Sequence, residues 1–170
     1  MTLPDAEQTL AALVETMRGA VAFDARFVGI YSGGAWLADR LAQAIPGDHA
    51  IGYIDVSYYR DDFNRTGLKP AVKASEIPFE VEGATIVLVD DVLFTGRSVR
   101  AAINELFDYG RPAAIELAVL VDRGGRELPI EATWAGTRLA VARDVSIVLS
   151  RGDDGRLALA TESAPEAGDA

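Results

Sequence analysis

The sequence predicts an α/β fold with a mostly parallel central sheet flanked by helices. Short apolar runs that are typical of buried strands alternate along the chain with segments whose apolar residues recur at helical spacing. Strands that alternate with helices form right-handed βαβ units, and such units build parallel sheets. The run 84–89 is apolar at nearly every position, as expected for a central strand that is covered on both faces.

The individual elements follow from this pattern and from the turn residues. Helices are predicted before Gly19, after the tight turn 32–34, and after Ser98 with an end at 109–112. Residues 1–160 are expected to form a single domain, and 161–170, rich in Ala, Glu and Asp, a disordered tail. The predicted strands are 26–31, 50–58, 84–89 and 114–121, with weaker candidates at 132–135, 145–149 and 156–160.

The composition excludes several classes of protein. The chain has no cysteine and one histidine, His49, which excludes a thiol nucleophile and most histidine-based metal binding. No apolar run approaches the ~20 residues that cross a bilayer, and the N-terminus lacks the pattern of a signal peptide. We therefore expect a cytoplasmic protein with no membrane partner. The net charge of −10 argues against indiscriminate binding to nucleic acid.

One predicted strand end has the pattern of a sugar-phosphate site. The run 84–89 leads into Asp90 and Asp91, and then into a Thr95-Gly96 turn before a helix. Backbone N–H groups and hydroxyls at a helix N-terminus bind phosphate, and glycine lets the backbone approach the ligand closely. Two carboxylates beside a phosphate suit an uncharged group such as the vicinal hydroxyls of a ribose. The alternative is that these residues only end a strand and cap a helix. Neither a P-loop nor a GxGxxG pattern is present.

The stretch 89–98, Val-Asp-Asp-Val-Leu-Phe-Thr-Gly-Arg-Ser, resembles the signature with which type I phosphoribosyltransferases bind 5-phosphoribosyl-1-pyrophosphate (PRPP). Residues 55–62, 110–112, 117–124 and 126–130 further resemble the PyrR family of pyrimidine-operon attenuation regulators, which also have uracil phosphoribosyltransferase activity. The resemblance implies the type I phosphoribosyltransferase fold, with a flexible loop and a small hood. It also implies that uracil and PRPP react to UMP and pyrophosphate, with Mg²⁺ held mainly by PRPP rather than by protein ligands.

The same resemblance implies roles for individual residues. The predicted catalytic residues are Asp90 and Asp91, on the ribose hydroxyls, and Arg60, on the pyrophosphate from the flexible loop 60–76. Arg123 is predicted to contact the substrate from the hood, and the backbone near Val145 to read uracil. The rest of the predicted substrate-binding set lies in the phosphate turn and in the loop after the first strand: Val92, Leu93, Phe94, Thr95, Gly96, Arg97 and Ser98, with Ser32, Gly33 and Gly34.

Two departures from the family pattern bear on function. The loop after the first strand reads Tyr31-Ser32-Gly33-Gly34 where the family has a basic residue and Thr-Arg-Gly, so fixed positive charge is lost. RNA-binding members use a basic face, but Gly125, Glu131 and Thr137 stand where His, Arg and Lys are usual. Family membership favours binding of a pyrimidine-operon mRNA leader, and these local charges count against it.

Three functions remain open on the sequence alone. The first is an active enzyme that makes UMP from uracil. The second is a UMP- or PRPP-sensing RNA-binding regulator with weak or no catalysis, which Gly33 favours. The third is a purine-using relative, against which the hood segment 122–124 counts. Relatives are usually dimers, so we expect a homodimer or higher homo-oligomer, with Phe63 and Trp134 as candidate interface residues.

Overall fold

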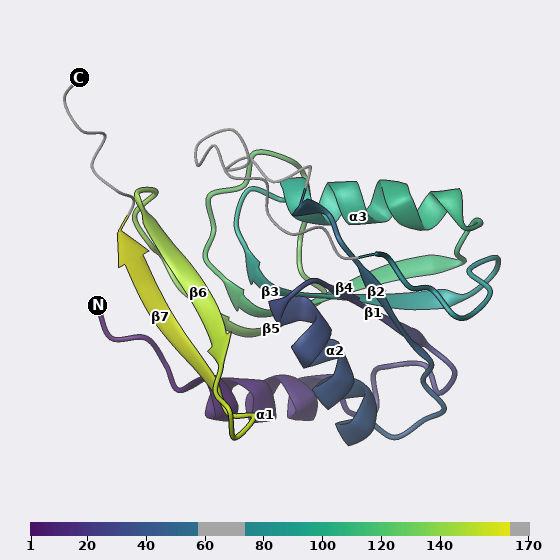
Figure 1. Ribbon diagram of the computed structural model, residues 1–170, viewed down its shortest axis with the longest axis horizontal. Coiled ribbons are helices and arrows are strands. Elements are labelled where there is room, and N and C mark those ends of the chain that lie inside the picture. The colour runs from purple at the N-terminus through teal and green to yellow at the C-terminus, as the bar shows by residue number, and fades with distance from the viewer. Residues whose placement is uncertain (58–73, 164–170) are drawn as a thin grey trace.

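The computed structural model describes residues 1–57 and 74–163. These residues form a parallel five-stranded sheet in the order β2-β1-β3-β4-β5 and a separate antiparallel hairpin, β6-β7 (Figure 1). The predicted α/β fold is thereby confirmed. The elements are α1 Ala6–Met17, β1 Arg26–Ile30, α2 Gly33–Ala44, β2 Ile51–Ile54, β3 Thr85–Leu93, α3 Arg97–Asp108, β4 Ala114–Asp122, β5 Trp134–Arg138, β6 Val145–Arg151 and β7 Leu157–Ser163.

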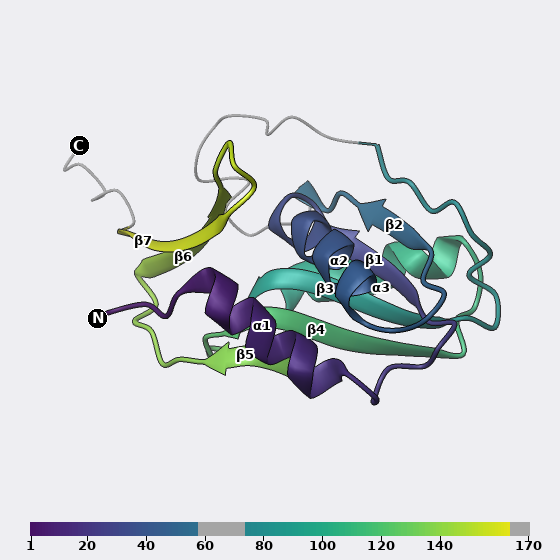
Figure 2. The same cartoon turned by 90° about the horizontal axis from the view of Figure 1, so that it is seen from below.

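Helices cover both faces of the sheet. Helices α1 and α2 lie on one face and α3 on the other, as Figure 1 and the view from below in Figure 2 show. One core cluster packs α1, α2 and the hairpin against the sheet and includes Leu37 and Leu120, whereas the α3 cluster includes Leu88 and Leu106. Burying such a side chain stabilises the folded state by about 1.5–3 kcal/mol relative to leaving it exposed. Strands β3 and β4 contribute to both clusters, so they form the centre of the fold.

Strand β2 is shorter than the predicted range 50–58. It ends at Ile54 because side chains satisfy the backbone groups that follow. The N–H of Ser57 donates to Asp55 Oδ1 at 2.8 Å, and the N–H of Asp55 donates to Ser75 Oγ at 3.3 Å. These hydrogen bonds to side chains take the place of the sheet ladder beyond Ile54.

Strand β3 is longer than predicted. The charges of Asp90 and Asp91 suggested an end at Val89, yet Asp90 pairs with Val119 of β4 and the strand continues to Leu93. The ladder of a central strand outweighs the low strand propensity of aspartate. Both acids therefore lie within the strand rather than beyond its end.

The C-terminal part contains all three of the weaker strand candidates, with shifted bounds, as β5, β6 and β7. Strand β7 continues to Ser163 and so enters the predicted tail 161–170, because residues 161–163 pair with 145–147 of β6. Trp134, a predicted interface residue, is instead buried in the core at 8% exposure, and Phe63 lies outside the described residues. Within 1–57 and 74–163, no helix is long and apolar enough to span a membrane.

Glu116 of β4 allows a test of how burial affects stability. Its Oε2 has no hydrogen-bond partner among the described residues, and burial raises the pKa of this carboxyl by desolvating the charged form. The folded state therefore binds the proton more tightly than the unfolded chain, and stability falls as pH rises from the unfolded toward the folded pKa. Glu116→Gln should raise Tm at pH 7 by 2–4 °C, the shift that about 1 kcal/mol produces in a domain of this size.

Thermal unfolding at pH 7 and at pH 3 measures this effect. The gain should disappear at pH 3, where Glu116 is protonated in both states. Glu80 is exposed and serves as the matched control, for which Glu80→Gln should leave Tm unchanged at either pH. An equal gain at both pH values would contradict the desolvation argument.

Candidate active site

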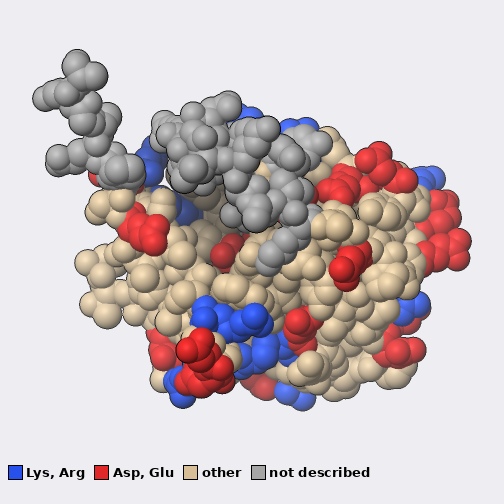
Figure 3. All heavy atoms as spheres, in the orientation of Figure 1, with Lys and Arg blue, Asp and Glu red and all other residues tan. Residues whose placement is uncertain are grey.

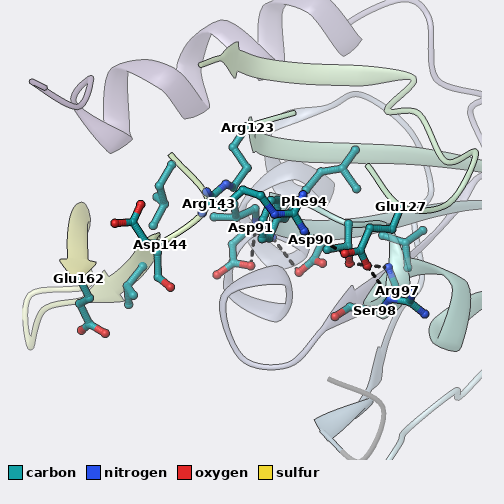
Figure 4. A pocket seen from close by; sticks show the side chains of 18 residues that line it. Asp90, Asp91, Phe94, Arg97, Ser98, Arg123, Glu127, Arg143, Asp144 and Glu162 are labelled. Atoms are coloured by element: carbon teal, nitrogen blue, oxygen red, sulfur yellow. Dashed lines mark hydrogen bonds and ion pairs between the residues drawn. The ribbon is translucent and has the colours of Figure 1, made fainter. Parts of the chain in front are cut away.

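A cleft of about 780 Å³ lies at the carboxyl ends of the central strands and faces the β6-β7 hairpin (Figure 4). Ligands of open α/β sheets bind at this edge, and the volume is that of a typical small-molecule site. The predicted segment from Asp90 to Ser98 lines the cleft throughout, together with Arg123. Sequence reasoning did not single out the remaining lining residues: Val99, Glu127, Arg143, Asp144, Ser146, Ile147, Val148 and Glu162.

The turn between β3 and α3 has the geometry of an anion site. Gly96 has a φ of 91°, which only glycine adopts readily, and it is the N-cap of α3. The helix was predicted to begin after Ser98. It begins at Arg97 instead, so Ser98 lies inside its first turn. Thr95 Oγ1 accepts a hydrogen bond from the N–H of Arg97 at 3.2 Å. The N–H groups of this turn lie at the positive end of the helix dipole.

The two acids are held in place by the backbone that follows them. Asp90 Oδ1 accepts the N–H of Asp91 at 2.9 Å, and Asp91 Oδ1 accepts the N–H of Val92 at 2.9 Å. Asp90 is only 3% exposed, whereas Asp91 is more open. Figure 4 shows both carboxyl groups pointing into the cleft. The arrangement offers two oriented hydrogen-bond acceptors beside the anion site.

The loop after β1 packs directly against β3. A Cβ on Gly33 would lie 2.5 Å from Asp91 Oδ2, and one on Gly34 would overlap the carbonyl oxygen of Val89. Glycine at both positions therefore lets the N-terminus of α2, whose N-cap is Ser32, approach the end of β3. The predicted residues 32–34 border Asp91 in this way, although they do not line the cleft themselves.

Tyr31, which stands where the family has a basic residue, is part of an aromatic contact. Its ring centroid lies 5.4 Å from that of Tyr53, whose hydroxyl donates to Asp39 at 2.5 Å. Burial raises the pKa of both phenols above their ordinary value of 10.0, so both are neutral at physiological pH. The loop thus presents neutral side chains at positions where the family has fixed positive charge.

Arg123 lines the cleft and also ties together the two segments that form the hood, 123–128 after β4 and 139–144 between β5 and β6. It is 4% exposed, and its Nη1 and Nη2 donate to the carbonyl oxygens of Val145, at 2.5 Å, and Ala142, at 2.7 Å. Its guanidinium carbon lies 4.0 Å from the centroid of the Phe94 ring. Burial, followed by the nearby charge of Arg143, lowers the pKa of this guanidinium. The predicted contact residue therefore has two of its donors committed to backbone.

Val145, whose backbone is predicted to read uracil, lies next to the cleft but not in its lining. Its carbonyl accepts the hydrogen bond from Arg123, and Val145 is not among the residues that line the cleft. Its neighbours Asp144 and Ser146 do line it. The backbone near Val145 is thus at the cleft as predicted, but this carbonyl already has a partner. Arg60, the third predicted catalytic residue, lies outside the described residues.

The segment after β4 is bonded to the phosphate turn. The N–H groups of Glu127 and Leu128 donate to the carbonyl of Thr95, at 3.0 and 3.2 Å. Arg126 Nη1 donates to the carbonyl of Phe94 at 3.0 Å, while its Nη2 pairs with Asp122 at 2.7 Å. Glu127 belongs to the segment 126–130, which is part of the family resemblance, so its place at the cleft had a signal in the sequence. Arg143 had none, and the only signal for the hairpin side of the cleft was the prediction that the backbone near Val145 reads uracil.

Comparisons with known proteins define the class to which this fold and cleft belong. A family model described as "Phosphoribosyl transferase domain" matches residues 12–148. A hypoxanthine-guanine phosphoribosyltransferase from Bacillus anthracis has the same fold, with a TM-score of 0.65, 20% identity and 85% of each chain covered. A purine phosphoribosyltransferase from Pyrococcus horikoshii gives a TM-score of 0.62 at 24% identity, over 82% of this chain and 85% of that one. The class is that of the phosphoribosyltransferases.

The sequence relatives are closer and more specific. A "Bifunctional protein PyrR" from Ralstonia nicotianae is 53% identical over 149 residues, which cover 87% of this chain and 85% of the relative. Another, from Pseudomonas paraeruginosa, is 46% identical over 153 residues, covering 88% and 90%. This chain belongs to the PyrR family of phosphoribosyltransferases.

The close approach of α2 to β3 predicts the effect of one substitution. Gly34→Ala should destabilise the fold by about 1–3 kcal/mol, because the added methyl meets a backbone oxygen that cannot move away. Gly152→Ala is the control, since its Cβ would meet only the carboxylate oxygen of Asp154, the tip of an exposed side chain that can shift at the cost of one exposed hydrogen bond to the N–H of Arg156. Urea unfolding measures both, and equal stability of Gly34→Ala and the wild type would contradict the packing.

Proposed function

We propose that the protein is a uracil phosphoribosyltransferase that converts uracil and PRPP to UMP and pyrophosphate. In this reaction the bond between uracil N1 and ribose C1′ forms, the bond from C1′ to the pyrophosphate oxygen breaks, and the N1 proton is released. The observation that carries the proposal is the presence, in one cleft, of the acids Asp90 and Asp91 beside the glycine turn at Gly96. The family membership of the chain supports the same reaction.

The residues of the cleft suggest how the substrate is held. The 5′-phosphate binds the N–H groups and hydroxyls of Thr95 to Ser98, and the ribose hydroxyls donate to Asp90 and Asp91. The negative charge of the two aspartates also stabilises the positive charge that develops on the ribose as pyrophosphate leaves. Catalysis then rests mainly on orientation and electrostatic stabilisation, with the ribose fixed while the two reacting atoms approach.

Mg²⁺ would enter this site with PRPP, whose phosphates would supply most of its ligands. In the described part of the chain, no group of three or more His, Cys, Asp or Glu side chains is arranged to hold a metal ion. Mg²⁺ typically keeps several waters and binds substrate phosphates with one or two carboxylates. Asp91, with its second oxygen beside Gly33, is the acid best placed to contribute. The ion supplies positive charge that offsets the charge of the leaving pyrophosphate.

A UMP-sensing regulator with weak catalysis is the second candidate. The neutral residues Tyr31 and Gly33 favour it, because the loop lacks the fixed charge that would hold pyrophosphate. Binding of RNA has less support. Gly125 has a φ of 78°, and a Cβ there would overlap the Phe94 ring, so the position disfavours the family's histidine. Acidic and basic side chains are mixed over the face in Figure 3.

Removing one charge at a time tests the ribose assignment. Asp91→Asn should lower kcat/KM for PRPP about 10- to 100-fold, since a hydrogen bond to a charged group contributes about 1.5–3 kcal/mol. Asp90→Asn should act in the same direction. Asp108, exposed on α3, provides the control Asp108→Asn, which should leave the kinetics unchanged.

A spectrophotometric assay with PRPP, Mg²⁺ and each of uracil, orotate, hypoxanthine and guanine measures these effects and the base preference together. Wild-type turnover of hypoxanthine or guanine in place of uracil would contradict the proposed substrate. Unchanged kinetics in both Asp variants would remove the ribose assignment.

A filter-binding assay with the pyrimidine-operon leader RNA tests the regulatory candidate. We expect binding to be weak at physiological salt with or without UMP, because Glu131 and Gly125 replace cations of the family. Glu131→Arg should strengthen binding and steepen the salt dependence by about one unit of slope. Tight binding by the wild type that depends on UMP would instead establish the regulator.

A further inference from the structure

Arg143 is a cleft residue that no sequence motif predicted. It lies in the segment between β5 and β6, lines the cleft, and keeps 65% of its side chain exposed. Its guanidinium carbon is 5.3 Å from the centroid of the Phe94 ring, and its Nη2 is 2.9 Å from Glu127 Oε1. Figure 4 shows it beside Phe94 and Asp91, on the side of the cleft formed by the hood.

Glu127 holds Arg143 and the phosphate turn at the same time. Its Oε2 accepts a hydrogen bond from Arg97 Nε at 2.9 Å, so one carboxylate bridges the first residue of α3 to the hood. The hydrogen bond from Arg97, and then that from Arg143, lower the pKa of this carboxyl, which is therefore charged at neutral pH. The ion pair and the ring contact together restrict the guanidinium of Arg143 to one region of the cleft.

Arg123 and Arg143 approach the same ring but differ in what their donors do. Both Nη groups of Arg123 donate to carbonyl oxygens, those of Ala142 and Val145, which flank Arg143 in the sequence. Arg123 thereby fixes the backbone that carries Arg143. A guanidinium has five N–H donors. Within the described residues Glu127 engages the Nη2 of Arg143, so further donors of this exposed side chain remain for a ligand.

We propose that Arg143 binds a carbonyl oxygen of the nucleobase and that Glu127 is the residue that positions it. The inference rests on the proposed function, which places UMP in the cleft. With the phosphate at Gly96 and the ribose at Asp91, the base of a nucleotide extends toward Phe94 and the hood. A guanidinium donates hydrogen bonds and accepts none. Arg143 therefore selects bases that present a carbonyl oxygen rather than an amino group at this position.

Calorimetric titration with UMP and with ribose 5-phosphate tests the contact. Ribose 5-phosphate has the phosphate and the sugar of UMP but no base. Arg143→Gln should weaken UMP binding about tenfold or more, the effect of one hydrogen bond to a charged group, and change ribose 5-phosphate binding by no more than about twofold. The control is Arg151→Gln, since Arg151 also lies over an aromatic ring, that of Trp36 at 4.8 Å, but outside the cleft. It should change neither affinity.

Glu127→Gln separates positioning from contact. This variant should weaken the binding of UMP about threefold to fivefold. It should also weaken the binding of ribose 5-phosphate, because Arg97 in the phosphate turn loses the same partner. Unchanged UMP affinity in Arg143→Gln, or an equal loss for the two ligands, would overturn the base contact. Wild-type protein that does not bind UMP would overturn the proposed function as well. Wild-type protein that binds UMP but does not turn over uracil would refute the enzyme alone, and the comparison of affinities would still decide the role of Arg143.

Discussion

The ladder between β3 and β4 is the interaction on which the candidate site depends. It carries the two adjacent acids, Asp90 and Asp91, inside a central strand instead of leaving them in a loop. An aspartate at the end of an ordinary strand would be free to turn toward water. Here the ladder fixes the backbone, and each carboxylate accepts the N–H of the next residue. The orientation of the acids is therefore set before any ligand arrives, which is the preorganisation that electrostatic catalysis requires.

A second constraint is the close contact between the phosphate turn and the segment after β4. The carbonyls of Phe94 and Thr95 accept hydrogen bonds from Arg126, Glu127 and Leu128. Because the hood is anchored to the same turn that forms the anion site, the two ends of the cleft are held at a fixed separation. The proposed subsites for the base and for the phosphate are in this way parts of one hydrogen-bonded unit.

Charge is distributed unevenly around the cleft. Arg97, Arg123 and Arg143 lie toward the turn and the hood, whereas the loop after β1 presents the neutral Tyr31 and Gly33. The carboxylate of Asp91 occupies the space next to Gly33. The described part of the site is thus better provided with cations for a nucleoside monophosphate than for pyrophosphate. This uneven distribution of charge is the reason for retaining nucleotide sensing as a second candidate function beside catalysis.

The sheet, the order of most elements and the turn at Thr95-Gly96 could all be predicted from the sequence, because the spacing of apolar residues and the placement of glycines are local properties of the chain. The segment 89–98 identified the anion site and the acids for the same reason. The opposite side of the cleft, which faces the hairpin, could not be predicted in this way. Arg143 and the hairpin residues carry no motif, and they reach Phe94 only because Arg123, Glu127 and the pairing of β6 with β7 bring distant segments together. Contacts between residues far apart in the chain leave no periodic trace in a single sequence.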